Sequence, residues 1–200
     1  MPRKKKFDPE RALDEAMDVF WEKGYKATSV QDLVDRMGIN RFSMYDTFGG
    51  KRELFLAALD RYRETQIDEL FARLEAGSRE PAGLDAIREF FRRLIEVCSG
   101  SDGWRGCLIT NSAVELAPHD RTVAKRVSDH LQRMEDAFRR ALSHARKAGE
   151  LKKGSPMRDL ARFLTGAVVG LTVLAKTSPG RRALERYAAT VLGTVTAYGP

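Results

Sequence analysis

The sequence predicts an all-α protein with about nine helices. Apolar residues recur at helical spacing along most of the 200 residues. No Asn-Gly or Asp-Gly pair lies between two runs of alternating apolar and polar residues, the usual signature of a β-hairpin. Most of the seven prolines precede a helical pattern, and proline is favoured at the first position of a helix. Helices are therefore expected throughout the chain.

The first helix is expected between Asp8 and Gly24. Asp8 is a favourable N-cap, and Pro9 follows at the first helical position. Gly24 is the expected end, because glycine readily adopts the conformation that terminates a helix. The stripe that this helix should bury consists of Leu13, Ala16, Met17 and Phe20.

A second helix is expected at residues 30–37. Thr28 and Gln31 have the spacing of a capping box, in which each side chain satisfies a free backbone N–H. Gly38 is the expected stop, because glycine takes the left-handed conformation at low cost. Asn40 is a favourable N-cap for a third helix at residues 41–48. Two helices joined by so short a glycine turn indicate a helix-turn-helix motif.

The third helix carries more polar and aromatic side chains than a short structural helix normally exposes, with only Met44 and Phe48 expected to face inward. A helix that enters the DNA major groove needs hydrogen-bonding side chains near its N-terminus. Lys51, at the start of the next helix, is well placed to bind a phosphate. Spacing alone leaves two interpretations open: DNA binding, or a solvated helical hairpin inside an all-α protein.

The N-terminal quarter resembles the DNA-binding domain of TetR-family transcriptional regulators. Two positions depart from the family pattern: Phe42 stands where a small residue is common, and Asn40 where serine is common. The matching residues are Ala16, Phe20, Trp21, Gly24, Tyr25, Thr28, Ser29, Gly38, Ile39, Ser43, Met44, Tyr45, Phe48, Lys51 and Leu54.

The resemblance implies a ligand-responsive repressor that acts as a homodimer on a near-palindromic operator and is released by a small-molecule inducer. It implies a helix-turn-helix DNA-binding domain at residues 1–50 and a ligand-binding and dimerisation domain at residues 51–200. The alternative is a DNA-anchored interaction protein without a small-molecule ligand. On the DNA-binding interpretation, phosphate contacts come from Ser29, Tyr45 and Lys51, and base contacts from Gln31, Arg41, Phe42, Ser43 and Thr47.

The net charge of +7 and the pI near 9.6 favour an anionic partner. Residues 1–52 hold 11 basic and 9 acidic residues, so the motif itself is only mildly basic. The residues from Arg3 to Lys6 form a basic arm ahead of the first helix. This arm either follows a phosphate backbone or minor groove, or is a solubilising terminus.

The C-terminal part is expected to hold a long helix at residues 51–74, which would link the DNA-binding domain to the body. Further helices are expected from Pro81 to Cys98, at about 104–117 and at about 119–149. The last two, at 156–175 and 179–195, are unusually apolar, and Gly166 and Gly170 would allow another helix to approach closely. The family pairs these two helices into a dimer interface; an internal hairpin core is the alternative.

The resemblance places an effector cavity among the helices of the body. A pocket of aromatic side chains with few polar groups suits a small hydrophobic or electrophilic molecule. Ordinary core packing is the alternative for each residue taken singly. The candidate lining residues are Phe90, Phe91, Leu94, Trp104, Cys107, Leu108, Asn111, Met134, Phe138 and Phe163.

Cys107 supports a separate hypothesis. The segment GCLITNSAVEL resembles the corresponding part of an electrophile-responsive subgroup of the family, in which this cysteine is a sensor. Arg105 and a helix N-terminus could together lower the thiol pKa and make it nucleophilic. The alternative is a small, inert, apolar packing residue.

The motifs that would indicate other classes of protein are absent from the sequence. It has no glycine-rich phosphate loop, no HExxH and no CxxC, so we expect no enzyme, no cofactor and no metal site. His119, His130 and His144 are expected in solvated or capping roles. The longest apolar stretch, 163–175, is shorter than the roughly 20 residues of a membrane span. We therefore expect a cytoplasmic protein with no membrane partner.

Overall fold

The computed structural model describes residues 7–75 and 83–200, and these residues form helices and connecting turns without a strand. The N-terminal helices are α1 (Pro9–Lys23), α2 (Val30–Met37) and α3 (Arg41–Phe48). A continuous rod follows, made of α4 (Lys51–Tyr62), the π-helix η1 (Arg63–Ile67) and α5 (Asp68–Glu75). The remaining elements are α6 (Gly83–Ser99), the 3-10 turn η2 (Gly103–Arg105), α7 (Leu108–Glu115), α8 (Arg121–Lys147), α9 (Met157–Ala175) and α10 (Arg181–Thr196).

The expected all-α fold with about nine helices is confirmed, with α4 to α5 counted as one rod and within the part of the chain that the structure describes. The basic arm at residues 3–6 and Pro81 lie outside these residues. None of the helices described has the length and apolar character that crossing a membrane requires.

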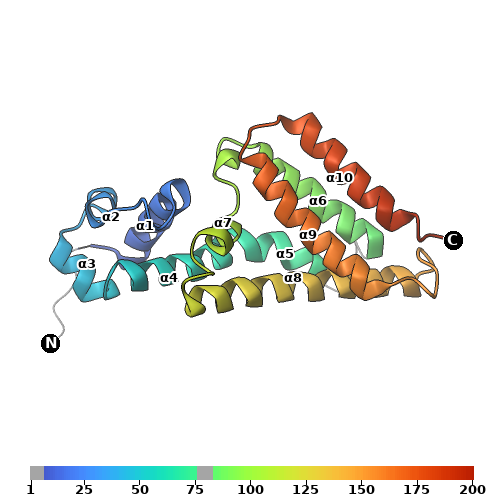
Figure 1. The fold of residues 1–200 in the computed structure, drawn as a ribbon, viewed down its shortest axis with the longest axis horizontal. Helices are drawn as coiled ribbons and strands as arrows, with labels where there is room; N and C mark the ends of the chain where they lie inside the picture. Colours follow the sequence, from blue (N-terminus) through green and yellow to red (C-terminus); the bar gives the residue numbers. More distant parts are fainter. Residues whose placement is uncertain (1–6, 76–82) are drawn as a thin grey trace.

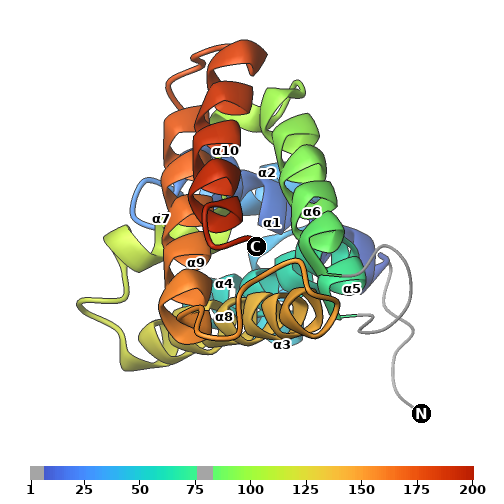
Figure 2. The same ribbon diagram turned by 90° about the vertical axis from the view of Figure 1, so that its right-hand side faces the viewer.

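The molecule has a small head at one end and a larger helical body at the other. Figure 1 shows α1, α2 and α3 together at the left, with α3 farthest from the C-terminus. The α4–α5 rod and α8 run lengthwise through the molecule, and α5 contacts α8. In Figure 2, α6, α9 and α10 stand across these two rods and complete the body. The rod that begins under the head therefore continues into the body.

The head folds around aromatic residues of α1 and α4. The Phe20 ring meets the Phe55 ring edge-on at a centroid distance of 5.0 Å, and Tyr25 lies 4.9 Å from Phe55. Met44 is the fully buried residue of α3, as expected from its position, and Leu33 of α2 is also fully buried. Burial of these apolar side chains fixes α3 against α4 and leaves the outer side of α3 in solvent.

The helix ends of the head follow the expected capping pattern with one shift. Asn40 accepts a hydrogen bond from the Ser43 N–H at 2.8 Å, and Gly38 has φ of 65°, so both predictions are confirmed. The capping box of α2, however, is formed by Ser29 and Asp32, not by Thr28 and Gln31. Ser29 Oγ accepts from the Asp32 N–H at 3.0 Å, and Asp32 accepts from the Ser29 N–H at 2.8 Å.

Thr28 has another role, which explains the shift. Its side chain is buried, and its hydroxyl donates to the Gly24 carbonyl at 2.6 Å. This bond closes the turn between α1 and α2. The N-cap is therefore Ser29, one residue later than the capping pattern suggested, while the helix itself spans the expected residues Val30–Met37.

The rod was expected to be a regular helix, but it contains a π-turn at η1. The Asp68 N–H bonds to the Arg63 carbonyl, five residues back. Tyr62 and Ile67 are both buried. They are five residues apart, a separation that places two residues on the same side of a π-turn but on different sides of an α-helix. This spacing of the apolar residues is the sequence signal for the irregularity.

The helix expected at 104–117 is also interrupted. The short turn η2 is separated from α7 by Gly106, whose φ is 67°. Space is tight here as well, because a Cβ on Gly106 would meet the Lys176 side chain. The interruption turns Trp104 to the surface, where it is 49% exposed.

Gly103 provides a test of how tightly this connection is packed. A Cβ at Gly103 would overlap the carbonyl group of Cys98, so Gly103→Ala must displace the backbone of the 98–106 segment. We expect a loss of about 1–3 kcal/mol in the free energy of unfolding, measured by urea denaturation. Gly154→Ala is the matched control, because no atom in the described part of the chain lies within 4 Å of its Cβ position. Equal stability of the two variants would contradict this packing.

Candidate DNA interface and effector cavity

The outer side of α3 presents the residues predicted to contact DNA. Phe42 is 78% exposed and Tyr45 49% exposed, values that are high for aromatic side chains on an eight-residue helix. Arg41 is also exposed, whereas Ser43 and Thr47 are half-buried. The surface thus combines a cation, hydroxyl groups and an apolar ring, which are the groups that read base edges in a major groove.

Gln31 and Arg41 lie side by side across the helix-turn-helix. An Arg41 guanidinium N–H donates to Gln31 Oε1 at 3.1 Å, and Gln31 Nε2 donates to Asp35 at 2.6 Å. Gln31 is therefore not a capping residue; it links α2 to the first residue of α3. Because this bond restrains the long Arg41 side chain, it reduces the conformational entropy that binding would have to remove.

The residues predicted to contact phosphates flank α3. Ser29 is exposed at the start of α2, although its hydroxyl also donates to Asp32 at 2.7 Å. Lys51 begins α4, and its ammonium lies 4.4 Å from the centroid of the Tyr25 ring. No side chain caps the first turn of α4 among the residues described, so the N–H groups there remain available to an anion.

Trp21 joins the head to the body. Its indole N–H donates to the Gly106 carbonyl at 3.0 Å, and its ring meets the Tyr62 ring edge-on at 4.9 Å. The Arg105 guanidinium lies 5.0 Å from the Trp21 ring and bonds to Asp18 of α1 at 2.8 Å. The segment that precedes α7 is therefore attached directly to α1.

A second attachment is made by Glu115 at the end of α7. Its carboxylate accepts from the Tyr25 N–H at 3.0 Å and from the Lys26 N–H at 2.7 Å. These N–H groups belong to the turn between α1 and α2. Glu115 thus ties the end of α7 to the turn that supports the helix-turn-helix.

An apolar cavity of about 70 Å³ lies in the body, directly behind Trp21. Of the residues predicted to line an effector pocket, Phe90, Leu94, Cys107 and Met134 line this cavity. Several other lining residues were not predicted, because they come from separate elements with no shared motif. These include Trp21, Tyr62, Ile67, Phe71, Cys98, His130 and Thr172.

The other predicted lining residues lie elsewhere. Phe91, Leu108 and Phe138 are buried in the core and do not line the cavity. Trp104 and Phe163, at 49% and 41% exposure, lie at the surface. The Asn111 amide donates to the Arg105 carbonyl at 2.9 Å and lines a shallow surface groove instead.

Cys107 and Cys98 both face the cavity and are buried. Burial, reinforced by Cys107, raises the pKa of the Cys98 thiol to about 12, so Cys98 remains an unreactive thiol near neutral pH. Cys107 is the residue that precedes the first turn of α7. The Arg105 guanidinium is held by Asp18 and Asp102 and packs on Trp21. Activation of Cys107 by Arg105 stays a prediction.

Comparisons with known proteins decide the family. Residues 12–58 match the family model described as bacterial regulatory proteins, tetR family. Residues 83–191 match the model of the tetracyclin repressor-like C-terminal domain. The chain belongs to the TetR family. It is a DNA-binding transcriptional regulator and not an enzyme, as the sequence predicted.

Similar proteins support this assignment over nearly the whole chain. The sequence is 39% identical over 178 residues to the uncharacterised HTH-type transcriptional regulator YezE of Bacillus subtilis (strain 168), covering 88% of this chain and 90% of YezE. It is 31% identical over 192 residues to the HTH-type transcriptional repressor ComR of Escherichia coli (strain K12), covering 95% and 90%.

Two solved structures share the fold. A cysteine mutant of the TetR family transcriptional regulator CifR, complexed with 26-bp double-strand operator DNA, superposes with a TM-score of 0.85 at 29% identity, over 95% of this chain and 98% of CifR. Reduced E. coli NemR has a TM-score of 0.78 at 20% identity, over 91% and 93% of the two chains.

In this TetR-family chain, α9 keeps an apolar stripe at the surface. Phe163, Val173 and Leu174 are each 41–47% exposed, and they lie on one side of the helix together with Gly166. Tyr187 of α10 packs against α9, and a Cβ on Gly170 would meet its hydroxyl. Among the residues described, this stripe is left exposed beside α10.

The geometry of α3 and α4 predicts different losses for two variants. If Arg41 contacts a base, Arg41→Ala should lower the discrimination at one base pair by about 1–3 kcal/mol. If Lys51 contacts a phosphate, Lys51→Ala should weaken specific and non-specific DNA binding alike and reduce the magnitude of the salt slope by about 1. Salt-dependent titrations with duplex DNA measure both.

Arg146→Ala is the control for charge in these titrations. Arg146 is exposed in the last turn of α8, far from α3, and should bind DNA as the native chain does. Native-like binding by both the Arg41 and the Lys51 variants would contradict the proposed docking.

Proposed function

We propose that this TetR-family regulator is a repressor that binds a near-palindromic operator as a homodimer and leaves it when a small effector binds. Residues 1–50 would form the DNA-binding domain and residues 51–200 the effector-binding and dimerisation domain. The observation that carries the proposal is Trp21, which belongs to the head helix α1 and also lines the cavity of the body.

The DNA contacts divide by chemistry. Ser29, Tyr45 and Lys51 would hold phosphates and fix the position of the head. Base edges in the major groove would be contacted from α3 by Arg41, Ser43 and Thr47, and from α2 by Gln31. The exposed Phe42 ring would contact a thymine methyl group, because an apolar surface in that position gains from being removed from water.

The homodimer would form through α9 and α10. Its support is the exposed stripe with Phe163, Val173 and Leu174, because apolar side chains that cluster on a surface favour association. A two-fold dimer would place its recognition helices about 34–36 Å apart, the spacing of successive major grooves on one side of DNA. The operator would then repeat with the same two-fold symmetry.

Induction would be a shift between two populations. The cavity of about 70 Å³ is smaller than the roughly 300–1,000 Å³ that pockets for drug-sized molecules occupy. A larger effector must therefore widen it and would bind better to an expanded form. Trp21 belongs to the head, and α7 is attached to it through Glu115. Widening that displaced either of them would hold the two heads of the dimer at the wrong spacing.

The small cavity also favours the alternative of a DNA-anchored interaction protein that binds no effector. The two functions differ in whether any small molecule changes operator affinity. The native chain is first tested for sequence-specific binding.

Selection from random duplex DNA, at two salt concentrations, tests the DNA-binding half of the proposal. We expect an enriched near-palindrome, because a two-fold dimer contacts two equivalent half-sites. The Arg41→Ala protein serves as the comparison and should enrich the same sequence with one position relaxed. Binding that falls steeply with salt and enriches no sequence would show a non-specific basic protein and contradict the proposal.

The electrophilic class of effector is tested with N-ethylmaleimide. We expect alkylation of the native chain to lower operator affinity, because an adduct at Cys107 would enlarge the cavity behind Trp21. Cys107→Ser should abolish this response, whereas Cys98→Ser should retain it, because the raised pKa of the Cys98 thiol leaves it unreactive. Release that persists in Cys107→Ser would exclude Cys107 as the sensor.

A further inference from the structure

His130 lines two neighbouring cavities. It is a residue of α8, only 6% exposed, and not solvated as the sequence had suggested. On one side it lines the apolar cavity behind Trp21. On the other it lines a charged cavity of about 80 Å³ between the α4–η1 segment and α8. A molecule that occupied both cavities would have to touch His130.

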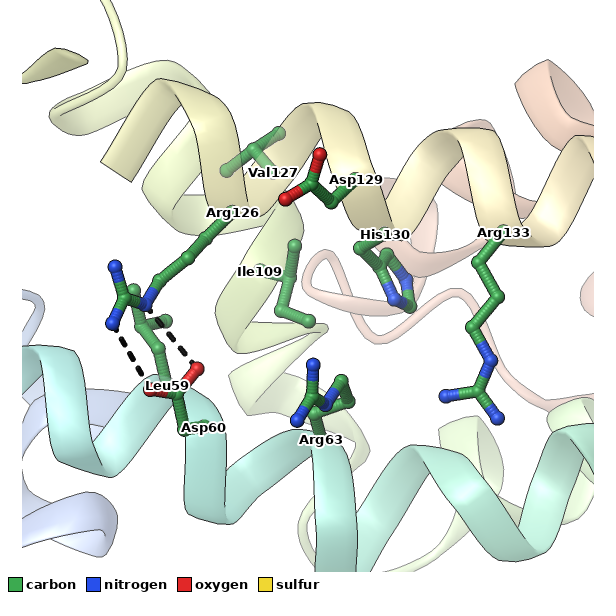
Figure 3. Close-up of a pocket in the computed structure, with 9 residues that line it drawn as sticks. All are labelled: Leu59, Asp60, Arg63, Ile109, Arg126, Val127, Asp129, His130 and Arg133. Carbon is green, nitrogen blue, oxygen red and sulfur yellow. Dashed lines mark hydrogen bonds and ion pairs between the residues drawn. The ribbon is translucent and has the colours of Figure 1, made fainter. Parts of the chain in front are cut away.

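The charged cavity holds three arginines, and two of them are already paired. Arg126 makes a two-point ion pair with Asp60, at 3.2 and 3.0 Å, drawn as dashed lines in Figure 3. Arg133 bonds to Glu75 at 2.8 Å and also to Asp68. These pairs neutralise both guanidinium groups.

Arg63 is different, because it is exposed and no ion pair holds it among the residues that the structure describes. It is the first residue of the π-turn, a type of irregularity that often occurs at functional sites. Figure 3 shows the Arg63 side chain extending from the rod into the space beneath α8, toward which the His130 ring also points. Asp129 lines the same cavity but pairs with Lys125 at 2.6 Å.

The His130 imidazole has an unused hydrogen-bonding group. Its Nδ1 is buried and has no partner among the described residues, an arrangement that is rare and costly in a folded protein. Burial, assisted by the charges of Arg133 and Arg63, lowers its pKa to about 4, so the ring is neutral near pH 7. A neutral imidazole offers one N–H donor and one acceptor to a bound molecule.

We propose that the effector of this regulator is a small amphipathic carboxylic acid, with its carboxylate between Arg63 and His130 and its apolar part in the cavity behind Trp21. The proposal rests on the ligand-responsive function proposed above and specifies the chemical class of the ligand. A guanidinium without a partner selects an anion over a neutral group, and a carboxylate oxygen accepts from the imidazole N–H.

The size of the cavity restricts the apolar part. A cavity of roughly 150 Å³ holds a benzene ring, which is twice the volume available behind Trp21. A short aliphatic tail therefore fits with little change, whereas a ring must widen the cavity. Aromatic acids should accordingly displace Trp21 more than short aliphatic acids do, and should release DNA more effectively.

The test compares acids with their neutral amides. Calorimetric titration of the native chain with butyrate, benzoate, butyramide and benzamide measures binding, and operator titrations in their presence measure release. We expect each acid to bind about tenfold or more tightly than its amide, because the amide cannot pair with Arg63. Arg63→Gln should abolish this preference, and Arg146→Gln, which removes one charge at the far end of α8, should retain it.

His130→Phe provides a second variant. It removes both ring nitrogens while retaining an aromatic ring against Phe71, whose centroid lies 5.8 Å from that of His130. Because Nδ1 has no partner among the described residues, the melting temperature should be retained or raised, while the affinity for both acids falls several-fold. A loss of affinity in a stable protein separates ligand binding from folding.

Three results would overturn the proposal: equal binding of acid and amide, unchanged acid binding by Arg63→Gln, or no binding of either acid. The outcome for operator release is separate. If the acids bind through Arg63 without changing operator affinity, the carboxylate site stands and the proposed induction fails. If the amides release operator DNA and the acids do not, the induction stands and the carboxylate site fails.

Discussion

The hydrogen bond from the Trp21 indole to the Gly106 carbonyl, 3.0 Å long, connects the two ends of this molecule. Trp21 belongs to α1, which packs on α2 and α4 and so determines how α3 is presented. The same side chain forms part of the wall of the apolar cavity. Trp21 is therefore part of both the cavity wall and the head. While its hydrogen bond to Gly106 is intact, neither the cavity wall at Trp21 nor the head can move far.

The remaining architecture makes this connection stiff. The α4–α5 rod extends from the head into the body, and Arg52 near its start bonds to Asp120 at 2.8 Å, at the start of α8. Glu115 of α7 makes a further attachment, because its carboxylate accepts two hydrogen bonds from the turn between α1 and α2. Because a packed core resists gradual deformation, such a structure responds to a bound molecule by changing between discrete arrangements. The π-turn at Arg63 is the irregular point in the rod, and it lies beside the charged cavity.

Much of the fold could be predicted because it depends on local patterns. Glycine at a helix end and asparagine at a helix start act within one turn of the chain, so the ends at Gly24, Gly38 and Asn40 were correct. The cavity depends on contacts between distant segments, and no local pattern reports those. Trp104 and Phe163 have the composition of pocket residues but lie at the surface, whereas His130 looked solvated and is buried.

Coupling between the cavity and the head is tested most directly by the alkylation rate of Cys107 in a Cys98→Ser protein. Cys107 is buried, so a reagent reaches it only when the cavity opens. If cavity opening and operator binding exclude each other, linkage requires that the operator duplex slow the alkylation of Cys107. We expect a several-fold decrease in rate with the operator duplex and an unchanged rate with a scrambled duplex. An equal rate in the free and the operator-bound protein would show that the cavity and the head move independently.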